Sequence, residues 1–324
     1  MRKIIILITL LVSQFVSTAF AAGGITHMFI AKEAVKQLPP QLRDVIYQNM
    51  DAYLVGAYYP DSGYIANTGY GEDSHWDPFV YAFSDYLREK YPYPAQQNPP
   101  LVAFLFGVAT HRISDEVTHW TFYPEIAKYD FKGDKTKAED VADMGIDILV
   151  NVEKNQWATK PSVWWVPVKD LLAIYHRMGK DQYTAAEIIR GNEVISIAGA
   201  GEKAIATEAY PVYKYIKLQW TDKHYYNWPT GGIVMDVQKV VEYQKALWAR
   251  LTTPRVNVDN FVSNGSSNKI TQQRKILANK TLLNCAQQAI KTNGATTNIT
   301  TNSDGSVSIR PVISDFQRLR CMKY

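Results

Sequence analysis

The chain has 324 residues, of which 46% are hydrophobic and 12% aromatic, so it is long and apolar enough to bury a substantial core. Its formal net charge is +4, and loss of Arg2 and Lys3 with a leader would lower it to +2. That value is too close to neutral for a general polyanion-binding protein, such as one that coats DNA.

Residues 1–21 have the pattern of a secretory signal peptide. A charged start is followed by an apolar run over 4–12 and by Ala-Phe-Ala at 19–21, which matches a cleavage site. The run is too short to anchor the chain stably in a bilayer. We therefore expect a mature chain that starts at Ala22 and is secreted or periplasmic. No later segment is apolar enough to cross a membrane.

Apolar residues recur at helical spacing along most of the chain, and convincing alternating strands are absent before residue 254. Thr26 is the expected N-cap of the first helix, which Pro39-Pro40 stops. Residues 55–76, rich in Gly, Tyr, Asp and Ser, predict a long irregular loop of the kind that often carries function. The fold class is therefore mainly α, with helices predicted over 27–38, 41–49, 78–90, 101–120, 136–154, 167–178, 184–198, 203–218 and 232–252.

The composition changes after Pro254. A polar, linker-like stretch precedes a predicted helix over 270–292, and the sequence from 294 to 313 predicts a hairpin that turns at Asp304-Gly305. In an oxidising compartment Cys285 and Cys321 could form one disulfide, with two free thiols as the alternative. The predicted organisation is a signal peptide (1–21), a catalytic domain (22–254) and a small C-terminal extension of unknown role (255–324).

The strongest functional signal is the string His111-Arg-Ile-Ser-Asp115-Glu-Val-Thr-His119. Each four-residue step along an α-helix turns by about 40°, so the three side chains emerge on one face. The surrounding sequence is strongly apolar, so this polar stripe would be buried, and buried charge needs a partner or a metal. Imidazole and carboxylate groups on one face suit Zn²⁺. A buried ion-paired face is the alternative interpretation.

A second string, Glu139-xxx-Asp143-xxx-Asp147, repeats this four-residue spacing on the next predicted helix. Its carboxylates are either further metal ligands or a solvated acidic face of that helix. His176 and His224 fall outside the cluster and are expected to be structural or surface residues. The sequence contains no GxSxG nucleophile elbow and no phosphate-binding glycine loop. The histidines and carboxylates therefore indicate a hydrolytic metal site.

The sequence resembles the zinc-dependent phospholipase C family and, more closely, the catalytic domain of the glycosylphosphatidylinositol-specific phospholipases D. The resemblance runs from about residue 22 to 180 and more weakly to about 250. It implies a multi-helix bundle of the zinc-dependent phospholipase C and P1 nuclease type that carries three zinc ions. The matching stretches are GGITHMFIAKEAV, QNMDAYLVGAYYPDSGY, SHWDPFVYAFSDYLREKYP, LVAFLFGVATHRISDEVTHW, DFKGDKTKAEDVADMGID and WWVPVKDLLAIYHRM.

The resemblance carries metal ligands onto this chain residue by residue. It implies that His75, His111 and Asp115 bind one zinc ion, with the carboxylate of Asp61 beside it. Asp115 is also implied to bridge to a second zinc ion, which His27 binds.

The processed N-terminal residue, here Ala22, is implied to ligate through its amine and carbonyl, and His119, Glu139 and Asp143 are implied to hold the third zinc ion. The family usually has histidine at the position of Glu139. Glutamate can bind zinc through oxygen, but a more anionic ligand set makes the metal a weaker Lewis acid. Asp140 or Asp147 could therefore take its place.

The resemblance implies a phosphodiesterase that hydrolyses phospholipid headgroups by C-type or D-type cleavage, with Asp61 orienting or deprotonating the attacking water. The expected substrate is a phospholipid or a glycosylinositol phospholipid; peripheral membrane contact, no nucleic-acid partner and a monomer are also expected. The alternatives are an S1/P1-type zinc nuclease and a non-catalytic lipid- or glycan-binding protein with a decayed site. Aromatic residues that could contact acyl chains or a choline-like group, or simply pack in the core, are Tyr58, Tyr59, Tyr64, Trp76 and Phe79.

Overall fold

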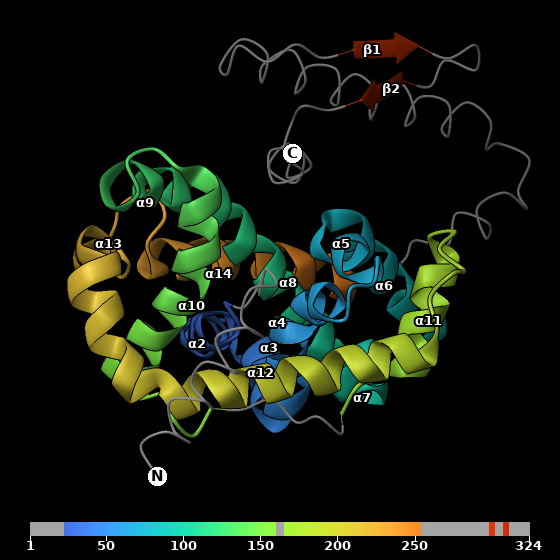
Figure 1. Cartoon of the computed structure of the whole chain (residues 1–324). Helices are drawn as coiled ribbons and strands as arrows, with labels where there is room; N and C mark the ends of the chain where they lie inside the picture. Colours follow the sequence, from blue (N-terminus) through green and yellow to red (C-terminus); the bar gives the residue numbers. More distant parts are fainter. Residues whose placement is uncertain (1–22, 160–164, 254–297, 302–306, 311–324) are drawn as a thin grey trace, which may run out of the picture. The chain divides into compact units, whose positions relative to one another are not determined.

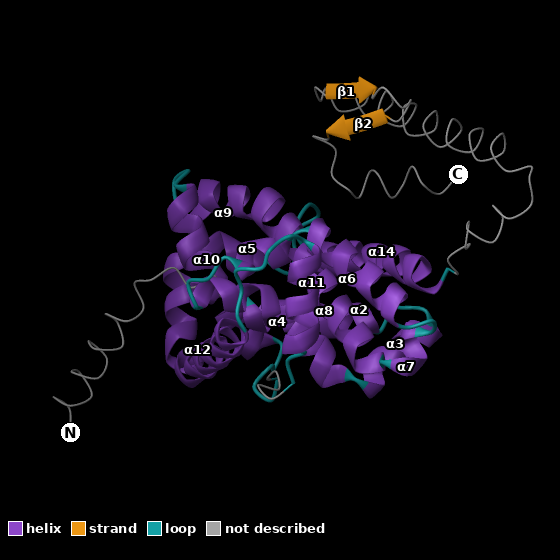
Figure 2. Ribbon diagram, turned by 90° about the vertical axis from the view of Figure 1, so that its right-hand side faces the viewer, coloured by secondary structure: helices purple, strands orange, loops and turns teal. Residues whose placement is uncertain are grey.

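The computed structural model describes residues 23–159, 165–253, 298–301 and 307–310. Residues 23–159 and 165–253 of this described part are helices joined by loops, which confirms the predicted mainly α fold (Figure 2). None of the described helices has the length and apolar character needed to span a bilayer. The helices are α2 (Gly24–Val35), α3 (Pro40–Gln48), α4 (Met50–Ile65), α5 (Tyr70–His75), α6 (Asp77–Lys90), α7 (Pro94–Gln97), α8 (Pro99–Val117), η1 (Thr118–Phe122), α9 (Tyr123–Asp130), α10 (Lys135–Glu153), α11 (Val168–Arg177), α12 (Ala185–Val212), η2 (Tyr213–Lys217), α13 (Gln219–His224) and α14 (Ile233–Thr252).

Helices α4 and α8 pack along each other at the centre of the helical unit (Figure 1). Their backbones approach closely at two glycines. A Cβ atom on Gly107 would lie 2.1 Å from the carbonyl oxygen of Tyr53, and one on Gly56 would lie 2.3 Å from the carbonyl oxygen of Phe104. Helix α8 is buried without interruption from Leu101 to Ser114, as expected for a helix that is apolar on all sides.

The prediction of a long loop over residues 55–76 is wrong, because this segment forms the C-terminal part of α4 and then α5. Its small and polar residues resemble a loop in the sequence, but α4 is buried continuously from Ala52 to Gly63. Pro60 lies inside the helix, where it cannot donate a hydrogen bond to the preceding turn. Packing against α8 has outweighed the local preference of these residues.

The N-terminus of α2 is capped by a side chain from another helix. The two carboxylate oxygens of Asp147, on α10, accept hydrogen bonds from the backbone N–H groups of Ile25 and Thr26, each at 2.8 Å. The N-cap position belongs to Gly23, so the prediction that Thr26 caps this helix is wrong. Because Asp147 is committed to these donors, it is a structural residue of the α2–α10 contact.

Helix α12 is one continuous helix, so the predicted break between 184–198 and 203–218 is wrong. Thr184 and Glu187 form a reciprocal capping box at its start. Gly199, which lies between the two predicted helices, faces the buried ring of Tyr58; a Cβ there would lie 2.7 Å from the hydroxyl oxygen. The glycine therefore serves close packing inside a helix.

The chain divides after Leu251 into two compact units. In the second unit, β1 (Asn298–Thr301) pairs antiparallel with β2 (Val307–Arg310), with Thr301 opposite Val307. The strands confirm the predicted hairpin, and the predicted turn lies outside the described residues. So do the predicted signal peptide with Ala22, the helix over 270–292 and both cysteines, Cys285 and Cys321.

The crossing of α4 and α8 leads to a stability prediction. We expect Gly107→Ala to lower the free energy of unfolding by about 2–3 kcal/mol, because the new methyl group would meet backbone atoms that cannot move aside. Thermal denaturation followed by circular dichroism measures the effect.

Gly201→Ala in α12 is the matched control, because nothing lies within 4 Å of a Cβ at that position. It should leave the protein as stable or raise its stability by up to about 1 kcal/mol, since glycine is a poor helix former. Equal melting temperatures for wild type and Gly107→Ala would contradict the close crossing.

Candidate metal centre and its pocket

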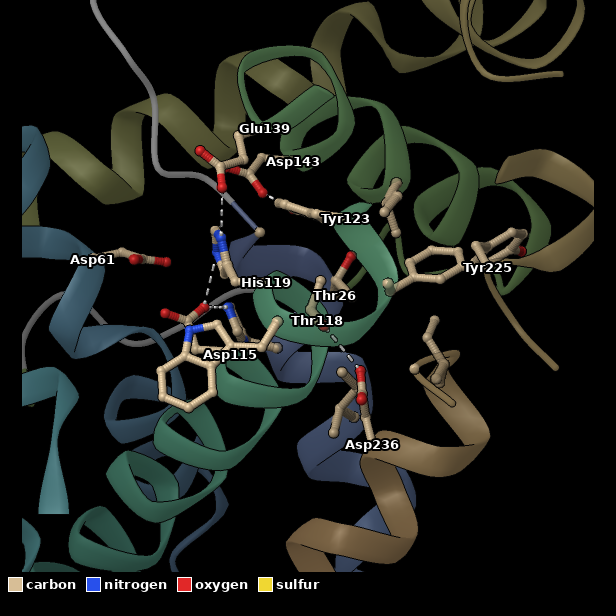
Figure 3. Close-up of a pocket in the computed structure, with 18 of the residues that line it drawn as sticks. Thr26, Asp61, Asp115, Thr118, His119, Tyr123, Glu139, Asp143, Tyr225 and Asp236 are labelled. Carbon is tan, nitrogen blue, oxygen red and sulfur yellow. Dashed lines mark hydrogen bonds and ion pairs between the residues drawn. The ribbon is translucent and has the colours of Figure 1, made fainter. Parts of the chain in front are cut away.

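A cavity of about 310 Å³ opens between α2, α8, α10 and α14 (Figure 3). Five carboxylates and three imidazoles line it, and none of the described lining residues is Lys or Arg. A concentration of acids without basic partners is unfavourable unless cations are bound. The lining carboxylates are those of Asp61, Asp115, Glu139, Asp143 and Asp236.

His75 and His111 face each other at the buried end of this site. Their Nε2 atoms lie only 3.0 Å apart. The Nδ1 atom of His75 lies 2.6 Å from the carbonyl oxygen of Gly71, and that of His111 lies 3.0 Å from the carbonyl oxygen of Ala57. A carbonyl oxygen only accepts, so both Nδ1 atoms carry a proton, and when both imidazoles are neutral their Nε2 lone pairs point at each other. Burial lowers the pKa of His75, but its contacts with Asp61 and Asp115 outweigh this effect and raise the pKa above its usual value, so a cation bound here would replace a proton on Nε2. Such an arrangement is typical of imidazoles held ready for a metal ion.

His27 adopts the same orientation from α2. Its Nδ1 atom lies 2.7 Å from the hydroxyl oxygen of Ser114, and this hydroxyl donates in turn to the carbonyl oxygen of Thr110 at 3.0 Å. The imidazole therefore donates through Nδ1. Its Nε2 atom is left facing the carboxylate of Asp115, at 3.5 Å from Oδ1.

Two carboxylates complete the cluster. Asp61 Oδ1 lies 3.3 Å from His75 Nε2 and 3.5 Å from His111 Nε2. Asp115 is central: its Oδ2 lies 3.7 Å from His75 Nε2, and its Oδ1 lies 3.5 Å from the Nε2 atoms of both His27 and His119. Neighbouring ligand atoms of tetrahedral zinc are about 3.4 Å apart, given Zn–N and Zn–O distances near 2.1 Å. The spacing of this cluster therefore fits zinc.

Two overlapping sets of ligand atoms are close enough together to surround one ion each. In the first, atoms of His27, Asp61 and His111 lie within 4.8 Å of one another, and in the second, atoms of His75, His111 and Asp115 do so. Because His111 has one Nε2 atom, it can ligate only one ion. Asp115, with two oxygens directed to different imidazoles, could hold two cations at once.

Burial and charge set the protonation states of these groups. Burial, reinforced by the neighbouring His27, lowers the pKa of His111 to about 3, so its imidazole is neutral near pH 7. Burial tends to raise the pKa of Asp115, but its contacts with His119 and His27 outweigh this effect and hold the pKa well below 3.8. Neutral imidazole and ionised carboxylate are the forms that bind metal.

The outer part of the site is more open. His119 Nδ1 lies 3.9 Å from Glu139 Oε1, and the Glu139 side chain is 51% exposed. Asp143 is held more firmly by a hydrogen bond from the Tyr123 hydroxyl, and burial raises the pKa of Asp143 to about 8. Figure 3 shows His119 between Asp115 and the two acids of α10. A nearby cation would ionise Asp143.

The structure brings the described residues of the predicted site together. All of them line the cavity except His111, which is completely buried behind it. Ala22 lies outside the described residues, and its neighbour Gly23 lines the cavity against His27. Asp140 is exposed, and Asp147 is occupied as a helix cap.

The predicted aromatic contacts are divided between the pocket and the core. Tyr64 and Trp76 line the cavity, whereas Tyr58, Tyr59 and Phe79 are buried in the helix packing. The sequence reasoning missed Thr118, Trp120 and Asp236, which also line it. Thr118 and Trp120 flank His119, so their proximity could have been inferred, but Asp236 comes from the distant helix α14.

A model of the zinc dependent phospholipase C family matches residues 26–181, the stretch that holds the described predicted ligands. This match supports the assignment of residues 26–181 to that family. No solved structure matches it.

Several curated relatives carry the name phosphatidylinositol-glycan-specific phospholipase D. The Homo sapiens protein is 32% identical over 209 residues, which cover 59% of this chain and 25% of the relative. The Mus musculus protein is 30% identical over 238 residues, with coverages of 69% and 28%. The Dictyostelium discoideum protein is 29% identical over 251 residues, with coverages of 72% and 26%. The chain thus spans about a quarter of the length of these relatives.

The two ligand sets lead to a prediction about metal content. We expect the dialysed protein to retain at least two zinc ions per chain, measured by plasma mass spectrometry. Asp115→Asn should reduce that number, because it removes the negative charge shared between the imidazoles of His27, His75 and His119.

Asp140→Asn is the control, since it removes the same charge from an exposed position on α10 and should retain the full zinc content. One zinc ion or none in the wild-type protein would rule out a multinuclear centre.

Proposed function

We propose that this protein is a zinc-dependent phosphodiesterase that hydrolyses phospholipid headgroups, by either C-type or D-type cleavage. The observation that carries the proposal is the pair of opposed Nε2 atoms of His75 and His111, set among buried carboxylates. The match to the zinc-dependent phospholipase C family supports the choice of metal and of a phospholipid as substrate.

The charges in the cavity explain why cations are needed for this reaction. A phosphodiester is an anion, and the described lining residues offer it five carboxylates and no Lys or Arg. Without bound cations the substrate would be repelled. Zinc held by the imidazoles and carboxylates would supply the charge that binds the phosphoryl oxygens and would lower the pKa of water towards 7.

The protein's own groups would hold and orient the reactants. Asp61 is 4% exposed, and its Oδ1 atom lies near both His75 and His111. We assign to it the orientation of the attacking water and the acceptance of its proton. The backbone carbonyls of Gly71 and Ala57 fix the two imidazole rings, so that the cluster is organised before substrate arrives.

An aromatic edge of the cavity suits an amphipathic substrate. Trp120 is 63% exposed, and its ring lies 6.5 Å from that of Trp76, measured between centroids. Tyr64 is 39% exposed and its hydroxyl donates to Glu72, as does the indole N–H of Trp76. Exposed indole rings favour contact with the polar–apolar boundary of a lipid surface. We propose peripheral membrane contact at this edge.

Processing at the N-terminus would complete the site. Gly23 lies against His27, where a Cβ would be 3.3 Å from the Nε2 atom. A free amine one residue earlier, on Ala22, would thus be close to the imidazoles. We therefore propose export to a secreted or periplasmic location, with removal of residues 1–21.

The proposed reaction is tested by incubating the purified protein with a panel of phospholipids and a glycosylinositol phospholipid. We expect zinc-dependent release of either a phosphorylated headgroup or phosphatidic acid, identified by mass spectrometry. Asp115→Asn should reduce the rate by at least about 100-fold, since removing a group that stabilises the charge of the reaction commonly has an effect of this size.

Asp140→Asn should retain nearly the wild-type rate. Cleavage of nucleic acid with no cleavage of any lipid would favour an S1/P1-type nuclease. Lipid binding without any product would favour a non-catalytic binding protein.

A further inference from the structure

One carboxylate of the cavity has no role in the metal cluster. Asp236, in the first turn of α14, is 2% exposed, and its Oδ1 atom has no hydrogen-bond partner. Its Oδ2 atom accepts a hydrogen bond of 3.1 Å from the hydroxyl of Thr118. A buried carboxyl with an unsatisfied oxygen is unfavourable, so its presence beside a cavity requires an explanation.

Asp236 lies across the cavity from Glu139 and Asp143, and its carboxylate points towards Thr118 (Figure 3). Thr118 follows Asp115 by three residues, which is about one helical turn, or 5 Å along the axis. The carboxylate is therefore close to the predicted metal ligands without being one of them. If cations at those ligands bound the phosphate, the adjoining part of a headgroup would be within reach of this carboxylate.

From this geometry we infer that Asp236 determines substrate specificity by binding a protonated amine of the lipid headgroup. The inference rests on the proposed function. An amine fits better than an anionic or neutral group because the described lining residues include no Lys or Arg that could pair with this carboxylate. A headgroup ammonium would supply both the missing hydrogen-bond donor and the missing positive charge.

The neutral acid form explains how Asp236 is tolerated in a buried position. Burial raises the pKa of Asp236 well above 3.8, while the hydrogen bond from Thr118 opposes the shift less strongly. Asparagine has nearly the shape of this neutral acid, so Asp236→Asn should fold normally. It keeps the contact with Thr118 but cannot carry the charge that attracts an ammonium group.

The test compares two pairs of lipids that differ only by replacement of the amine with a hydroxyl group. One pair is phosphatidylethanolamine and phosphatidylethylene glycol, and the other is glucosaminyl-phosphatidylinositol and glucosyl-phosphatidylinositol. The wild-type enzyme should prefer the amine member of one pair by about 10-fold or more in kcat/KM, as expected for loss of a charge-assisted hydrogen bond. The pair that shows the preference identifies the source of the amine.

In Asp236→Asn this preference should fall to nearly 1, through loss of activity on the amine lipid. The rate on the hydroxyl lipid and the zinc content should stay close to wild type. Glu242→Gln is the matched control, because it removes an exposed carboxylate from the same helix and should keep the preference. Thr118→Val, which removes the hydroxyl that holds the carboxylate, is a second variant and should weaken the preference.

Equal rates on both members of both pairs in the wild-type enzyme would overturn this inference and leave the proposed function intact. An unchanged preference in Asp236→Asn would also overturn it. If the wild-type protein cleaves none of these lipids or the wider panel, the proposed function fails and the inference fails with it.

Discussion

The Nε2 atoms of His75 and His111 face one another at 3.0 Å inside the helical unit, and they repel each other when both imidazoles are neutral. Backbone carbonyls of Gly71 and Ala57 hold a proton on the Nδ1 atoms of His75 and His111, on the far sides of the rings, so neither neutral ring can turn an N–H towards the other. A cation between the rings would convert this repulsion into attraction. The nearby carboxylates also need positive charge, because none of the described lining residues of the cavity is Lys or Arg.

The helix packing makes this arrangement possible. Gly56 and Gly107 let α4 and α8 cross at close range, and the same two helices carry Asp61 on one side and His111 with Asp115 on the other. Asp147 fixes the start of α2 against α10 and so positions His27 near Asp115. Residues far apart in sequence thus converge because buried backbone contacts determine where each helix begins and crosses.

The mainly α fold was predictable from the helical spacing of apolar residues. The metal cluster was indicated by the string from His111 to His119, which follows helical spacing within an apolar helix. The sequence did not predict the helical state of residues 55–76, since the burial that stabilises α4 depends on α8 and is invisible in the local composition. It also divided α12 into two helices, 184–198 and 203–218, whereas Gly199 between them accommodates the Tyr58 ring inside one continuous helix. Asp236 could not be found from the sequence, because a single acid on a distant helix has no spacing relation to the other residues.

Anomalous X-ray diffraction from crystals at the zinc absorption edge tests the central claim most directly. A cation bound by His75 and His111 should appear as a peak about 2.0–2.1 Å from both Nε2 atoms, with the carboxylate of Asp61 or Asp115 completing the shell. A second peak should lie near Asp115 and His27. A structure without metal density, in which His75 and His111 form a direct hydrogen bond with each other, would contradict the account.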